Sequence, residues 1–79
     1  MKNNLIKKEI LKILIKMKHL KKLNENTNLI AKGLIDSFDV IILVSLIEKK
    51  FSIKIPGEKI TLNNFSNINK ISRLVKDVY

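Results

Sequence analysis

One nearly unbroken apolar run dominates the sequence: residues 33–51, GLIDSFDVIILVSLIEKKF, which opens on Asp36, Ser37 and Asp39. At about 100° per residue, an α-helix over this run places one group of apolar residues on a single side: Val40, Leu43, Val44, Ile47 and Phe51. The opposite side carries Phe38, Ile41, Ile42 and Ser45. A small core covers only one side of a helix. We therefore expect the second group to be partly exposed, unless the loop at 29–35 covers it.

The composition favours helices over strands. Two glycines and one proline leave little material for β-hairpins. A chain of 79 residues forms one domain, whose folding buries roughly 60–65% of the surface that the unfolded chain exposes. We expect a single domain over residues 1–79 that is mostly helical.

The spacing of apolar residues predicts a first helix over about residues 5–23. Apolar residues recur there at three-and-four spacing, at Ile6, Ile10, Ile13, Met17 and Leu20. Leu11 and Ile15 lie off this stripe and either widen it or remain exposed. The polar residues that follow, at positions 24 and 26–28, end the helix and open a loop over 24–36 whose apolar residues cover the core.

A second helix is predicted over about residues 37–51. Asp36 suits its N-cap, and Asp39 places a negative charge in the positive first turn. Pro56 and Gly57 indicate an extended turn, so the next short helical turn is expected over about 61–65. A last helix is expected over about 67–78, capped by Asn67 or Ser66. The fold class predicted is all-α, a small bundle of three main helices and one short helical turn.

The positive charge is concentrated at the N-terminal end of the chain. The net charge is +9, and residues 1–23 contribute eight lysines against one acid. Lysine, asparagine and isoleucine together supply 38 residues, a bias that AT-rich codon usage favours whatever the function. A small basic nucleic-acid-binding domain is the alternative from a different class, but the sequence has one arginine and no interleaved aromatic residues. Peripheral association of the first helix with an anionic membrane is also open.

Other residue types exclude several kinds of chemistry. Without cysteine there is no disulfide, thiolate zinc site or cysteine nucleophile. His19 is the only histidine, so we expect a surface or boundary residue, no metal site and no enzyme. Lysines interrupt every apolar stretch long enough for a signal peptide or membrane span, at positions 7, 8, 12, 16 and 18. We expect a cytoplasmic monomer without stable membrane insertion.

Ser37 occupies a position with its own chemistry. It stands just after the predicted N-cap, where free backbone N–H groups and the helix dipole favour an attached or bound phosphate. A serine that serves only as a cap is the alternative interpretation.

The residues around this serine resemble a known motif. Gly33-Leu34-Ile35-Asp36-Ser37 is similar to the Gly-x-x-Asp-Ser attachment motif of acyl carrier proteins and of peptidyl or D-alanyl carrier proteins. The segment LIEKKFSIKIP resembles the end of that family's second helix and the loop after it, and ITLNNFSNINKISRLV resembles its short third helix and its last helix. The resemblance covers about residues 28–75.

The resemblance implies a carrier that is modified after translation. A phosphopantetheinyl transferase would join 4'-phosphopantetheine from coenzyme A to Ser37 Oγ, and the distal thiol would hold an acyl or aminoacyl group as a thioester. Asp36 would cap the helix and help the transferase recognise the serine. The cofactor would supply the thiol that the chain lacks.

The resemblance also suggests which kind of carrier this is. Members that serve fatty-acid synthesis are usually acidic along the second helix, whereas the corresponding face here carries Ile41, Ile42, Ser45, Glu48 and Lys49. The similarity therefore favours a stand-alone carrier that serves a dedicated adenylating acyl or aminoacyl ligase and a downstream acyltransferase or synthase. A fatty-acid-synthesis carrier is the alternative. Partners are expected to dock on Phe38, Asp39, Ile41, Ile42 and Ser45.

Overall fold

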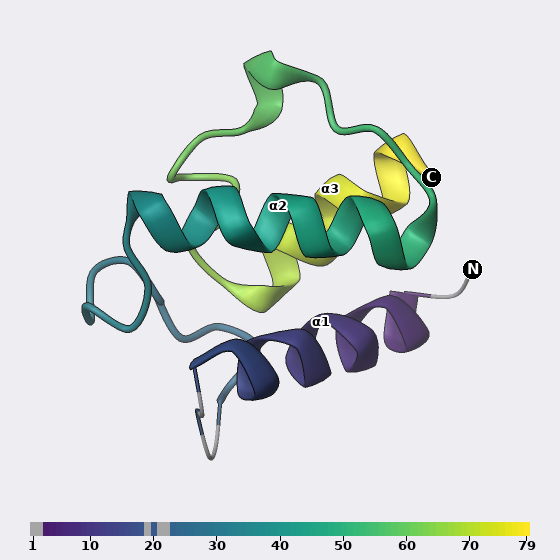
Figure 1. The fold of residues 1–79 in the computed structure, drawn as a ribbon. Helices are drawn as coiled ribbons and strands as arrows, with labels where there is room; N and C mark the ends of the chain where they lie inside the picture. The colour runs from purple at the N-terminus through teal and green to yellow at the C-terminus, as the bar shows by residue number, and fades with distance from the viewer. Residues whose placement is uncertain (1–2, 19, 21–22) are drawn as a thin grey trace.

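The computed structural model describes residues 3–18, 20 and 23–79, which form three α-helices and one 3-10 turn (Figure 1). The elements in chain order are α1 (Asn3–Lys18), α2 (Ser37–Phe51), η1 (Gly57–Lys59) and α3 (Ile68–Val78). No β-strand occurs in this described part of the chain. The all-α fold predicted from the sequence is confirmed.

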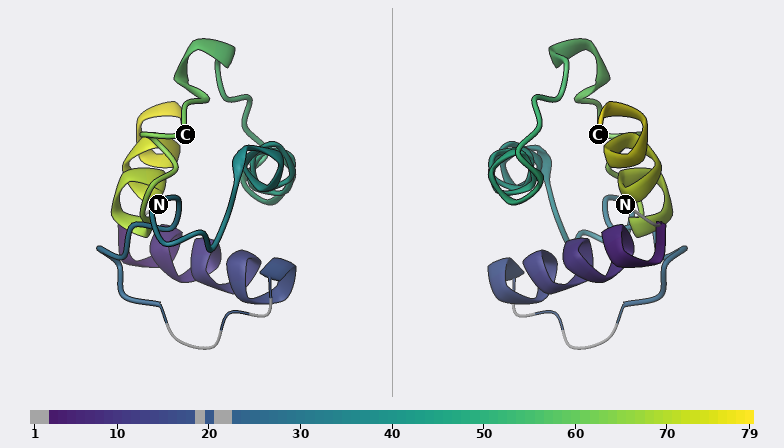
Figure 2. Two further views of the ribbon diagram at one scale, coloured as in Figure 1. Left: turned by 90° about the vertical axis from the view of Figure 1, so that its left-hand side faces the viewer. Right: turned by 90° about the vertical axis from the view of Figure 1, so that its right-hand side faces the viewer.

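The helices surround a single core. Figure 2 shows α2 nearly end on, with α1 crossing below it, α3 on the far side of the core, and the segment around η1 above. The backbone of α1 packs more closely on α3 than on α2. The side of α2 that faces away from α1 and α3 is therefore left without a helical neighbour.

The core contains the α2 residues that the helical spacing predicts to be buried. Sixteen apolar residues are buried: Ile6, Ile10, Leu14, Leu29, Ile35, Val40, Leu43, Val44, Ile47, Phe51, Ile55, Phe65, Ile68, Ile71, Leu74 and Val75. All five predicted core residues of α2 are among them. In α1, the buried row follows i, i+4 spacing through Leu14, which the predicted stripe omitted, while Ile13 and Met17 lie half-buried at its edge.

The prediction of a first helix over 5–23 is wrong at both ends. Helix α1 begins at Asn3 and ends at Lys18, and Leu20 and Leu23 lie outside any helix. The first turn begins with polar residues, which do not take part in the apolar spacing. The helix therefore starts before the first residue of that spacing. Leu20 and Leu23 are half-buried against the core, so the helical spacing of apolar residues continues in the sequence after the helix has ended. The remaining positions of that prediction, 19 and 21–22, lie outside the described residues, and so does the interpretation of His19.

The loop before α2 packs into the molecule, as the sequence predicts. Leu29 N–H donates to the Ser66 carbonyl at 2.6 Å, and the Leu29 carbonyl accepts from the N–H groups of Leu34 and Ile35 at 2.9 and 3.2 Å. Gly33 adopts a left-handed φ of 70°, which an L side chain rarely takes, and this reverses the chain just before α2. Leu29 and Ile35 therefore lie in the core and do not cover the outer side of α2.

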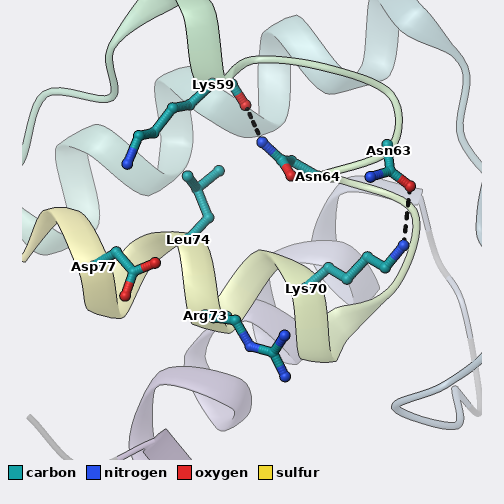
Figure 3. Close-up of a pocket in the computed structure, with 7 residues that line it drawn as sticks. All are labelled: Lys59, Asn63, Asn64, Lys70, Arg73, Leu74 and Asp77. Carbon is teal, nitrogen blue, oxygen red and sulfur yellow. Dashed lines mark hydrogen bonds between the residues drawn. The ribbon is translucent and has the colours of Figure 1, made fainter.

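The short turn predicted over 61–65 is present, since Phe65 N–H donates to the Thr61 carbonyl at 3.3 Å, but a second turn before it was not predicted from the sequence. The 3-10 turn is η1 at 57–59, which starts directly after Pro56, because the fixed φ of proline is compatible with entry into a helical turn. Residues 61–65 form a hydrogen-bonded turn that inserts Phe65 into the core. Asn64 Nδ2 joins the two turns by donating to the Lys59 carbonyl at 2.8 Å (Figure 3).

Helix α2 ends at a residue in an uncommon conformation. Ser52 has a φ of 55° and a ψ of 46°, the left-handed region, and its N–H donates to the Glu48 carbonyl. Glu48 Oε2 also accepts from Ile55 N–H at 2.8 Å, which holds the chain that leaves the helix. The C-terminus of α2 is therefore fixed by a conformation that favours glycine over serine.

We predict that Ser52→Gly raises the free energy of unfolding by about 0.5–1 kcal/mol, because it removes the steric cost of a left-handed side chain. The matched control is Ser45→Gly, at an exposed position inside α2, which should lower it by about 0.5–1 kcal/mol. Urea denaturation of both variants measures the difference. An equal loss of stability in both would contradict this account of the helix end.

Candidate functional site

A reciprocal capping box starts α2. Asp36 is extended, with a φ of −121° and a ψ of −175°, and its Oδ1 accepts from Asp39 N–H at 2.9 Å. In return Asp39 Oδ2 accepts from Asp36 N–H at 3.1 Å. Two backbone donors that helix geometry leaves free are thereby satisfied, and the first residue of the helix is set at Ser37. The predicted role of Asp36 as the N-cap is confirmed.

Asp39 belongs to the scaffold, which corrects its prediction as a docking residue. The residue is only 9% exposed, and its Oδ2 lies 3.2 Å from Lys18 Nζ in the last turn of α1. Burial by itself would raise the pKa of Asp39, but hydrogen bonds from the Asp36 backbone and the Lys18 ammonium group outweigh burial and lower it. The carboxylate is therefore ionised at neutral pH and engaged within the molecule.

Ser37 is left outside these interactions. It is the first residue of α2, it is exposed, and no hydrogen bond joins its Oγ to another described residue. Because Asp36 provides the cap, the interpretation of Ser37 as a bare capping residue is wrong. The site thus presents a solvent-facing hydroxyl on the positive end of a helix.

An apolar face extends along α2 from Ser37. Phe38 and Ile41 are 69% and 65% exposed, Ile42 is 37% exposed, and Ser45 is exposed as well. The alternative that the loop at 29–35 covers this face is wrong, because Phe38 and Ile41 remain mostly exposed. Leu46, 38% exposed, extends the face and was assigned to neither side from the sequence, although its i+4 spacing from Ile42 places it there.

The pocket shown in Figure 3 lies elsewhere. It has a volume of about 340 Å³ and is lined by Lys59, Asn63, Asn64, Lys70, Arg73, Leu74 and Asp77. Lys70 Nζ donates to Asn63 Oδ1 at 2.9 Å, and the Arg73 guanidinium group points away from the turn. The cations do not converge on one point, and none of the site residues predicted from the sequence lies in this pocket.

The described residues contain no group of three or more His, Asp or Glu side chains that could hold a metal ion. None of their helices combines the length and the apolar character needed to cross a membrane.

A family model described as the phosphopantetheine attachment site matches residues 8–75, from α1 into α3. The chain belongs to this family. Comparison with curated proteins and with solved structures gives no significant match. The protein is therefore a carrier: it holds covalently attached 4'-phosphopantetheine, is not itself catalytic, and works with a phosphopantetheinyl transferase and with synthase or ligase enzymes.

We predict that Asp39→Asn lowers the free energy of unfolding at pH 7 by about 1 kcal/mol, because it weakens the capping box and removes the ion pair with Lys18. The lowered pKa of Asp39 means that its ionised form stabilises the fold fully above the ordinary value of 3.8, and that this stabilisation is lost as the pH falls below it. The difference between wild type and variant should therefore narrow as the pH falls below about 3.8.

The control for this series is Asp77→Asn, at an exposed position in the last turn of α3. Its effect should stay under about 0.5 kcal/mol at every pH. Thermal unfolding followed by circular dichroism gives the comparison. A constant difference between wild type and Asp39→Asn across the pH range would refute the electrostatic role of Asp39.

Proposed function

We propose that Ser37 carries the phosphopantetheine arm. The observation that supports this most strongly is the division of roles at the start of α2, where Asp36 caps the helix and leaves the Ser37 hydroxyl exposed and unbonded to described residues. In the proposed reaction Ser37 Oγ attacks the pyrophosphate of coenzyme A. A phosphodiester to phosphopantetheine forms, the nucleotide half leaves, and the hydroxyl proton passes to a base of the transferase.

The surroundings of Ser37 suit an attached phosphate. The backbone N–H groups of Ser37 and Phe38 have no partner within the helix, and they point toward its positive end. Asp36 and Asp39 are the nearby negative charges: Asp36 Oδ1 accepts from Asp39 N–H, and Lys18 at 3.2 Å offsets the charge of Asp39. A phosphodiester on Ser37 Oγ therefore meets free donors, and the nearest buried carboxylate already has a counter-ion.

Because Ser37 is exposed, we propose that the arm presents its cargo to other enzymes and does not enclose it within the domain. A residue on the outer rim of α2 lets the arm extend into solvent, and the arm brings a thiol to a chain without cysteine. We propose a stand-alone monomeric carrier in the cytoplasm, charged by a dedicated adenylating acyl or aminoacyl ligase and discharged by an acyltransferase or synthase.

Incubation with coenzyme A and a broad-specificity phosphopantetheinyl transferase should add one phosphopantetheine mass to the full chain, measured by intact mass spectrometry. Ser37→Ala should abolish this addition. Ser45→Ala and Ser52→Ala, which change other exposed serines of the same region, should leave it complete. Persistent labelling of Ser37→Ala would assign the arm to another residue.

The outer face of α2 is the surface that we propose partners recognise. Phe38, Ile41 and Ile42 lie next to Ser37 and present apolar side chains to solvent, and Ser45 lies among them. An exposed apolar patch of this kind marks an interaction site in a soluble domain. An enzyme that reaches the arm has this face immediately before it, so apolar contact contributes to recognition.

We predict that Ile41→Glu separates docking from folding. At 65% exposure the change leaves the core intact, so the unfolding free energy should stay within about 0.5 kcal/mol of wild type, while the transferase kcat/KM should fall about tenfold. Val44→Ala, in the buried row of the same helix, should cost about 1–3 kcal/mol of stability and leave kcat/KM nearly unchanged while the domain is folded. Equal unfolding in the two variants, or unchanged kinetics in Ile41→Glu, would show that this face has no docking role.

A further inference from the structure

A second surface lies between α1 and α2. It is a groove of about 740 Å³ lined by Glu9, Lys12, Ile13, Lys16, Met17, Leu46, Lys49 and Lys50. Its apolar part consists of Ile13 and Met17 from α1 and Leu46 from α2. Four lysines from the two helices surround this apolar part, with one acid among them.

The lysines of the groove fall into two pairs. Glu9 lies 3.6 Å from Lys12 Nζ and 3.3 Å from Lys50 Nζ, and the hydrogen bond from Lys50 together with the charge of Lys12 lowers the pKa of Glu9 despite partial burial. Lys12 and Lys50 therefore have an internal counter-ion. Lys16 and Lys49 are exposed and form no ion pair with any described residue. The lining carries a net charge of +3, from four lysines and one glutamate.

The shape of the groove decides what kind of partner fits it. The apolar residues lie between two helices, where a side chain projecting from a convex surface can reach them and a flat bilayer contacts mainly the lysines around them. Met17 adapts to side chains of different shapes. The lining has no arginine and no aromatic ring to stack on a base, so nucleic acid gains only charge contacts here.

We propose that the groove between α1 and α2 docks an acidic amphipathic helix of a partner enzyme. An apolar side chain of that helix lies on Ile13, Met17 and Leu46, and flanking carboxylates pair with Lys16 and Lys49. That the partner is an enzyme that works on the arm rests on the function proposed above. The shape and charge of the groove are independent of that proposal.

The test uses the unmodified full chain, so that its result is independent of arm attachment. The probe is a designed helical peptide of about 18 residues, long enough to form a helix, with leucines along one face and glutamates beside them. Its counterpart has the same leucines and lysines in place of the glutamates. Each is titrated into nitrogen-15-labelled protein, and amide chemical shifts report where it binds. Vesicles of phosphatidylglycerol form a third titration.

The acidic peptide should shift the amides of Ile13, Met17, Leu46 and Lys49, and the basic peptide should not. The double variant Lys16→Gln with Lys49→Gln should weaken binding about fivefold, because two exposed charge pairs are lost. The matched control is Lys54→Gln with Lys76→Gln, which removes two exposed lysines away from the groove and should change binding by less than about twofold.

The docking proposal would be overturned by no shift at the groove with the acidic peptide, by equal weakening in the two double variants, or by shifts at the groove with the vesicles alone. Shifts confined to Phe38 and Ile41 would also overturn it, because the peptide would then bind the outer face of α2. The proposed function is tested separately: it is wrong if the transferase leaves Ser37 unmodified. That outcome would not change the result of the peptide titration.

Discussion

The carboxylate of Asp39 holds together the part of the molecule on which the site depends. It accepts the Asp36 N–H that begins α2 and pairs with Lys18 at the end of α1, so one side chain sets both where α2 starts and how that start sits against α1. Once the first turn is fixed, about 100° per residue determines the direction of every later side chain. The exposure of Ser37 and the burial of Val40 are two consequences of this one arrangement.

The small size of the domain explains why α2 keeps an apolar outer side. Helices α1 and α3 cover only the inner side of α2, and the described residues form no further α-helix that covers the outer one. Exposing Phe38 and Ile41 reduces solubility, and this cost is offset if partners bury them while they use the arm. Ser37 stands at the exposed start of α2, so a group attached there, as proposed above, would not disturb the packing.

The sequence predicts α2 and its cap well because two independent signals agree there. Asp36 and Asp39 identify the first turn, and the apolar period identifies the buried side. The end of α1 is not predictable in this way, because Leu20 and Leu23 serve the core from a non-helical backbone and so continue the period. The position of η1 was missed because Pro56 can start a helical turn as well as interrupt one. Asp39 was assigned to docking because the neighbour that buries it, Lys18, is distant in sequence.

The net charge does not show whether the lysines reflect codon bias alone or form a defined surface. Their positions in the fold distinguish these two explanations. Codon bias explains many lysines, but it gives no reason for Lys16 of α1 and Lys49 of α2 to lie at one apolar groove. Ser37 and Lys49 stand near opposite ends of α2, about 18 Å apart along the helix axis. A partner that engages both the outer face near Ser37 and the proposed groove must therefore lie along α2. Contact at the groove can then strengthen binding while Ser37, the proposed attachment residue, remains free to react.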